Sequence, residues 1–223
     1  METPLTILYT ANLRGQIDLL PRLHTFMRHL RTQRVEDEDE VMLCALEPPQ
    51  RRFLLLDLGE SCSPEVWHCA VTGGRSMLIV LDAMGYHAAN VSNMLTEEGR
   101  ARLEANLLNI ALVDPETGWQ QENIRVTCGE KRPHSAYGGG SEGEARLKVI
   151  LTPAAETRLD QRTLRLVAVQ AGQVGVVHLN TLAAITAHDV LTLPLGTPPD
   201  PTITATADFV LSEARLFQRK RES

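Results

Sequence analysis

The sequence lacks the two patterns that would place it in or across a membrane. No window reaches eighteen uninterrupted apolar residues, which a membrane-spanning helix needs. The first residues, M-E-T-P-L-T-I-L-Y-T, do not contain a basic segment followed by an apolar one, which is the pattern of a secretory signal. The sequence therefore predicts a cytoplasmic protein with no membrane partner.

An excess of positive charge is also absent. Lys and Arg number 22 against 28 for Asp and Glu, which gives a net charge of −6. A chain with this balance has no general electrostatic attraction to the phosphates of nucleic acids or of anionic lipids. Nucleic acid is therefore not an expected partner.

Cysteines are few, and none follows a metal-binding spacing. The four are Cys44, Cys62, Cys69 and Cys128. Without a secretory signal, cysteines in a chain of this size are expected to be reduced and partly buried, not paired as disulfides. A zinc cluster of Cys62, Cys69 and His68 is the weaker alternative, because their spacing matches neither C-x-x-C nor H-x-x-x-H.

The chain does contain enough apolar sequence to build a core. It has 223 residues, 43% of them hydrophobic and 22% charged, which predicts a single domain over residues 1–223. Loop insertions are expected near residues 35–52 and 114–146. The first begins with five consecutive acids and contains two prolines, and the second is polar and has three consecutive glycines.

In the first half of the chain, strand patterns alternate with helix patterns. Short apolar runs predict buried strands, and apolar residues at spacings of three and four predict helices. The predicted strands are residues 5–10, 53–58, 87–91 and 109–113, and the predicted helices are residues 18–34, 75–84 and 97–107. This alternation predicts parallel pairing with right-handed crossovers and helices that cover the sheet.

The second half changes character. Strand-like runs occupy residues 147–151, 164–169 and 174–179, and a turn signal at residues 170–173 predicts that the last two form a hairpin. A capping Asp200 followed by Pro201 predicts a last helix with one apolar face. The predicted fold class is therefore α/β, a layered fold with a mixed, partly parallel sheet flanked by helices.

Polar motifs follow the first three predicted strands, and the carboxyl ends of parallel strands are where reacting groups gather. They are T-A-N-L-R-G at residues 10–15, D-L-G-E-S at 57–61 and V-S-N-M-L at 91–95. Together they resemble the T-N-D-x-H-G, D-x-G-D and G-N-H-E blocks of calcineurin-like metallophosphoesterases of the 5'-nucleotidase type. The resemblance covers residues 5–113 and implies the layered fold of that family, incomplete at its C-terminal side.

The family resemblance implies a site with two divalent metal ions, which polarise a phosphate ester and generate a hydroxide. In this chain Asn12 and Arg14 replace the Asp and His of the first block. Glu60 replaces the bridging Asp, and Asn93 matches the Asn ligand. The preceding acid, Asp57, is expected to be structural.

Further family residues are missing. Met94 and Leu95 replace the transition-state His and its acidic neighbour, and are expected to fill the former cavity. The later S-H and G-H-x-H blocks have no counterpart. We therefore expect a degenerate, unoccupied metal site at Asn12, Glu60 and Asn93, with no catalytic residue and no cofactor; if any metal binds, the family implies Mn or Zn.

The sequence allows two interpretations of Arg14. In the first, Arg14 forms an ion pair with Glu60, which holds the two strand ends together in place of a metal ion. In the second, Arg14 and backbone N–H groups bind an anion such as a phosphate or nucleotide. A guanidinium has no lone pair to donate to a metal, so Arg14 is not a ligand.

Three functional classes remain open. The preferred one is a non-catalytic binding or scaffold protein of metallophosphoesterase-like type. The alternatives are a phosphate-ligand sensor that uses Arg14, and a metal-dependent phosphoesterase or nucleotidase with an atypical site. A protein partner or a homodimer is also predicted, because a shortened sheet leaves an open edge and the last helix has an apolar face that needs a cover.

Overall fold

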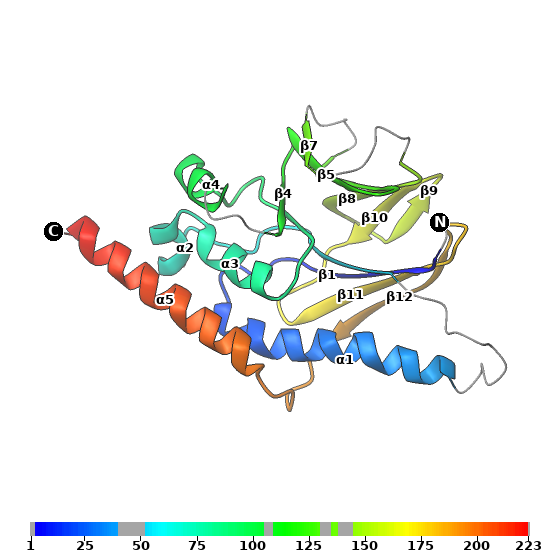
Figure 1. The fold of residues 1–223 in the computed structure, drawn as a ribbon, viewed down its shortest axis with the longest axis horizontal. Helices are drawn as coiled ribbons and strands as arrows, with labels where there is room; N and C mark the ends of the chain where they lie inside the picture. Colours follow the sequence, from blue (N-terminus) through cyan, green and yellow to red (C-terminus); the bar gives the residue numbers. More distant parts are fainter. Residues whose placement is uncertain (1–2, 40–51, 105–108, 130–134, 138–144, 223) are drawn as a thin grey trace.

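Helices, a first sheet and a second sheet lie in successive layers (Figure 1). The computed structural model describes residues 3–39, 52–104, 109–129, 135–137 and 145–222. The predicted fold class is confirmed, since the protein is α/β with mixed sheets flanked by helices. The helices cover one face of the first sheet, and the second sheet covers the other face.

The first sheet has the strand order β12-β11-β1-β2-β3-β4. Its parallel strands are β1 (Leu5–Thr10), β2 (Arg52–Asp57), β3 (Ala88–Asn90) and β4 (Ala111–Val113). Strand β11 (Gln173–Leu179) is antiparallel to β1, and β12 (Ile185–Thr192) is antiparallel to β11. The four predicted parallel strands are therefore confirmed.

The helices of the described residues gather on one face of this sheet (Figure 1). They are η1 (Ile17–Leu19), α1 (Leu20–Asp39), α2 (Trp67–Thr72), α3 (Arg75–Ala83), α4 (Glu97–Glu104) and α5 (Pro201–Glu222). Within the part of the chain that the structure describes, no helix is both long and apolar enough to cross a membrane.

The second sheet has the strand order β7-β5-β6-β8-β10-β9. Its strands are β5 (Thr117–Gln121), β6 (Ile124–Thr127), β7 (Ser135–Tyr137), β8 (Leu147–Ala154), β9 (Arg158–Asp160) and β10 (Thr163–Val167). The second sheet covers apolar side chains of strand β1. Leu8 packs among the helices, whereas Leu5, Ile7 and Tyr9 point to the other face and pack against the second sheet.

Two predictions about irregular segments are corrected. Helix α1 continues to Asp39, so it enters the segment 35–52 that was expected to be a loop. The segment 114–146 contains β5, β6 and β7. The alternation of β5 is concealed in the sequence, because its two buried positions hold Gly118 and Gln120 instead of apolar residues.

The predicted hairpin over residues 164–179 is wrong. A turn does form there, since the Gln173 N–H donates to the Gln170 carbonyl at 2.9 Å. However, β10 pairs with β8 and β9, whereas β11 pairs with β1 and β12. The turn therefore carries the chain from one sheet to the other, a distinction that local turn residues do not encode.

The predicted last helix is confirmed as α5. Asp200 caps it, because its Oδ1 accepts the N–H groups of Thr202 and Ile203 at 3.0 and 3.1 Å. The inner face of α5, which includes Ile203 and Val210, is buried against helices of its own chain. That face is thus not available for a second copy, and the homodimer stays a prediction without support from it.

Candidate functional site

The loops that follow β1 and β2 are joined through their backbones. The N–H groups of Asn12, Arg14 and Gly15 donate to the carbonyls of Gly59, Glu60 and Ser61, at 3.0, 2.9 and 2.8 Å. These bonds extend the parallel pairing beyond the strand ends and bring the first two sequence motifs side by side.

Three residues of these loops adopt left-handed backbone conformations without being glycine. The φ angles of Asn12, Arg14 and Glu60 are 55°, 47° and 57°. Each such residue costs about 1–2 kcal/mol relative to an ordinary conformation. Backbone strain of this kind persists where the surrounding fold enforces it, and it is concentrated at functional sites.

Asp57 anchors the second loop from inside the protein. Its carboxyl group is buried and accepts hydrogen bonds from Ser61 Oγ at 2.7 Å, Thr10 Oγ1 at 3.1 Å and the Gly59 N–H at 3.2 Å. Burial raises the pKa of Asp57 to about 7, against the lowering effect of these bonds. With its oxygens occupied in this way, Asp57 has the structural role that the sequence predicted.

A cleft of about 480 Å³ opens at the carboxyl ends of β1, β2 and β3. We call it the strand-end cleft. It is lined by Asn12, Leu58, Gly59, Glu60, Asn90, Ser92, Asn93, Pro115, Cys128, Gly129, Thr152 and Pro153. Three of the four predicted site residues, Asn12, Glu60 and Asn93, therefore come together in one cleft.

Arg14 does not line this cleft. Its side chain is exposed, and it forms no ion pair with Glu60, although both residues are described. The two residues are connected through their backbones instead. The ion pair expected from the sequence is therefore wrong.

Amides and hydroxyls dominate the chemistry of the strand-end cleft. The Nδ2 of Asn12 donates to the Val169 carbonyl at 2.8 Å, and the Nδ2 of Asn90 donates to the Leu58 carbonyl at 3.0 Å. These bonds orient the amide oxygens. Among the described residues that line the cleft, Glu60 is the only one with a charged side chain.

This donor set does not fit a dinuclear metal centre. Two divalent ions need several anionic or imidazole ligands, among them a bridging carboxylate. The described lining residues offer one carboxylate and no imidazole. Among the residues that the structure describes, no group of three or more His, Cys, Asp or Glu side chains is arranged to hold a metal ion. We therefore derive no chemical step through a metal pair.

Comparison with solved structures gives a remote likeness. No protein-family model and no curated protein sequence matches the chain. Among solved structures, the calcineurin-like phosphoesterase YfkN from Bacillus subtilis is similar to it. The match has 10% sequence identity and a TM-score of 0.49, over 98% of this chain and 100% of that chain. Values this low do not establish membership of that family.

Cys128 is a cleft residue that the sequence did not reveal. Its Sγ lies 3.1 Å from Asn90 Oδ1 and 3.3 Å from Ser92 Oγ. Burial raises the pKa of the thiol to about 11, so it is protonated and a poor nucleophile at neutral pH. No signal marked Cys128, because it follows β6 in a segment that was expected to be irregular.

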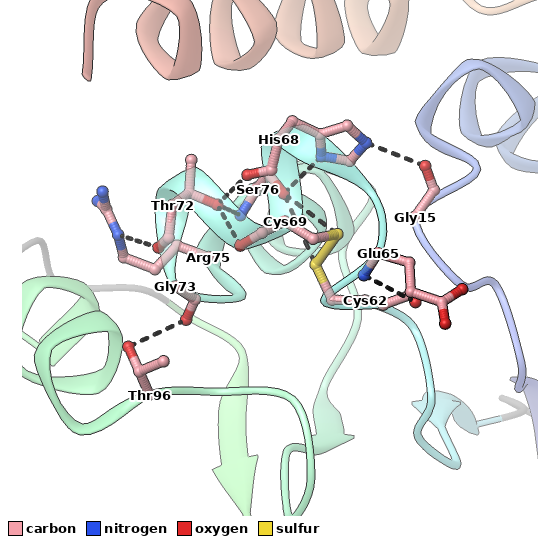
Figure 2. Close-up of a disulfide and its surroundings, with 11 residues drawn as sticks. Gly15, Cys62, Glu65, His68, Cys69, Thr72, Gly73, Arg75, Ser76 and Thr96 are labelled. Atoms are coloured by element: carbon pink, nitrogen blue, oxygen red, sulfur yellow. Dashed lines mark hydrogen bonds between the residues drawn. A yellow bond between two sulfur atoms is a disulfide. The ribbon is translucent and has the colours of Figure 1, made fainter. Parts of the chain in front are cut away.

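Cys62 and Cys69 form a disulfide beside the site, so the prediction of reduced cysteines is wrong for these two (Figure 2). It is confirmed for Cys128, which is free and buried, and Cys44 lies outside the described residues. The loop after β2 and helix α2 bring their Cα atoms to 5.7 Å. Both ring nitrogens of His68 have partners: Nδ1 lies 2.8 Å from Ser76 Oγ, and Nε2 lies 3.0 Å from the Gly15 carbonyl. Spacing alone did not indicate the pairing, because α2 was not predicted.

Proposed function

We propose that the protein is a degenerate metallophosphoesterase-like protein of 5'-nucleotidase type, which binds a ligand or partner without two-metal hydrolysis. The observation that carries this proposal is the lining of the strand-end cleft. Asn12, Glu60 and Asn93 converge there as the family pattern requires, but Glu60 is the only charged side chain among the lining residues.

The electrostatics of the cleft support a binding role. Two divalent ions bring four positive charges, and a single exposed carboxylate compensates only one of them. The Cys128 thiol does not help, because its raised pKa keeps it protonated. The oriented amide oxygen of Asn12 instead suits a donor on a neutral, hydrogen-bonding ligand.

Recognition of a phosphate by Arg14 gains no support from the site. Arg14 lies outside the lining, and among the described lining residues a phosphate in the cleft would face the Glu60 carboxylate and no cation. We therefore place the phosphate sensor below the non-catalytic binding or scaffold role. A cytoplasmic location and a protein partner, including a second copy, belong to the same proposal and are supported by the sequence patterns alone.

Metal analysis combined with a hydrolysis assay tests the proposal. We expect the purified protein to hold less than about one equivalent of transition metal, and to show no hydrolysis of nucleotides or phosphodiesters with Mn²⁺ above the rate of a Glu60→Gln variant. The matched control is Glu65→Gln, an exposed acid outside the cleft. Mn²⁺-dependent hydrolysis that Glu60→Gln abolishes and Glu65→Gln retains would establish the atypical phosphoesterase instead.

A further inference from the structure

The disulfide connects helix α2 to the loop after β2, which lines the strand-end cleft through Gly59 and Glu60. Cys62 follows Glu60 by two residues in the loop after β2, and Cys69 belongs to α2. His68, the neighbour of Cys69, contacts the Gly15 carbonyl in the loop after β1 (Figure 2). Gly15 in turn donates its N–H to the Ser61 carbonyl. The two loops and α2 thus form a closed unit, with the disulfide as its covalent link.

A second hollow gives access to this link. It has a volume of about 380 Å³, and both Cys62 and Cys69 line it although each residue is less than 5% exposed. None of the described residues that line the hollow has a charged side chain. Asn93 lines both the hollow and the strand-end cleft, so the two spaces are neighbours. We expect a small uncharged thiol reagent to reach the disulfide from this side.

The length of the bridged loop makes the effect of reduction local. Only 7 positions separate the two cysteines in the sequence. A bridge that closes so short a loop constrains the unfolded chain less than one that closes a long loop, so we expect the rest of the fold to persist when the bridge is reduced. The loop itself depends on it more, because the other contacts of the sulfurs are weak ones to Ser76 Oγ at 3.7 and 3.8 Å.

We propose that Cys62–Cys69 is a reversible redox site that clamps the loop carrying Glu60. A thiolate of a cellular dithiol attacks one sulfur, the S–S bond breaks, and the second thiol of the dithiol resolves the mixed disulfide. The protein gains two electrons and two protons as two thiols, and the dithiol becomes a disulfide. Disulfides in cytoplasmic proteins are usually of this transient kind, which agrees with the cytoplasmic location proposed above.

Reduction releases the covalent tie between Cys62 and α2. The hydrogen bonds of the loop with Asn12, Arg14, Gly15 and Asp57 remain. The loop that carries Glu60 is then held less firmly, so the redox state sets the order of one wall of the cleft. The inference does not depend on which ligand the cleft binds.

Hydrogen exchange with and without dithiothreitol tests the redox site on the full-length chain. We expect native protein to release thiols at Cys62 and Cys69, found by alkylation and peptide mapping, without added denaturant. Amide exchange at Arg14, Gly15 and residues 60–66 should accelerate about tenfold or more, while amides of β11 change less than about twofold. Oxidised glutathione should reverse both changes.

Two variants distinguish a redox-active disulfide from a purely structural one. Cys62→Ser/Cys69→Ser should exchange like the reduced protein and should not respond to dithiothreitol, whereas Cys128→Ser should respond like the unaltered protein. A bridge that dithiothreitol cannot reduce in the native protein overturns the proposal. So does reduction that leaves the exchange of Arg14 and Gly15 unchanged, or that accelerates β11 to the same extent.

Discussion

The carboxyl group of Asp57 is completely buried. Three hydrogen bonds, from Thr10, Ser61 and the Gly59 N–H, favour the ionised form. Complete burial outweighs them and raises its pKa from 3.8 to about 7. The protonated form is therefore favoured in the folded protein across a pH range in which the unfolded chain is ionised.

This pKa predicts how stability depends on pH. Between about pH 4 and 7 the folded state binds a proton that the unfolded state has lost, so the free energy of unfolding should fall as pH rises and level off above about pH 7. Over this pH range, the difference in protonation of Asp57 lowers the free energy of unfolding by up to about 4 kcal/mol in total. Urea denaturation at a series of pH values measures this slope.

Asp57→Asn is the control for that slope. The amide does not ionise, and it can still hydrogen-bond to the Thr10 and Ser61 hydroxyls. We expect its denaturation midpoint to vary less between pH 4 and 7 than that of the unaltered protein. An equal slope in both proteins would assign the pH dependence to other groups.

Site residues could be predicted from the sequence only where their position directly after a strand determines their place in the fold. Asn12, Glu60 and Asn93 follow consecutive parallel strands, so their convergence follows from the topology. The direction of the Arg14 side chain could not be predicted, because it depends on a left-handed backbone conformation. Cys128 enters the cleft from the second sheet, which the sequence did not reveal.

At the scale of elements, the strands with continuous apolar runs were the ones that could be predicted. Strands β1 and β2 are buried on both faces for most of their length, so most of their positions are apolar. Strand β12 is half-exposed at the edge of the sheet, and its sequence, ITAHDVLT, carries no such run. The sheet that each strand joins was not predictable either, because contacts between segments far apart in the chain decide it.

The pairing of β1 with β11 depends on one close contact. Tyr9 and Gly175 are directly opposite each other, and a Cβ atom added to Gly175 would lie 2.0 Å from Cζ of the Tyr9 ring. The ring is fully buried and has no room to move. Only glycine leaves space for the aromatic side chain on the neighbouring strand.

Gly175→Ala should therefore destabilise the protein by about 2–3 kcal/mol, the cost of overpacking a core. Its effect should be much smaller in a Tyr9→Ala background, where the ring is gone. Gly196→Ala is the matched control, because nothing lies within 4 Å of its added Cβ. Chemical denaturation of the four variants measures the coupling, and additive effects of Tyr9→Ala and Gly175→Ala would contradict it.

At the scale of the whole molecule, the two cores share the first sheet. The core between helices and sheet contains Leu8 and Leu55, and the core between the sheets contains Ile7 and Leu54 from the same two strands. Loss of β1 or β2 would thus remove one wall of both cores. This sharing supports the prediction that residues 1–223 form a single domain.

The two tryptophans can test whether the layers unfold together, since Trp67 is in α2 and Trp119 is in β5 of the second sheet. Trp67→Phe leaves a probe of the second sheet, and Trp119→Phe leaves a probe of the helix layer. Because β1 and β2 belong to both cores, we expect the two fluorescence transitions to coincide in urea, and to coincide with the loss of helix measured by circular dichroism. The second sheet does have a way to unfold first, since its strands β5–β10 are consecutive in the chain. An earlier midpoint for the Trp119 signal would show that this sheet is a separate cooperative unit and that the single-domain prediction fails.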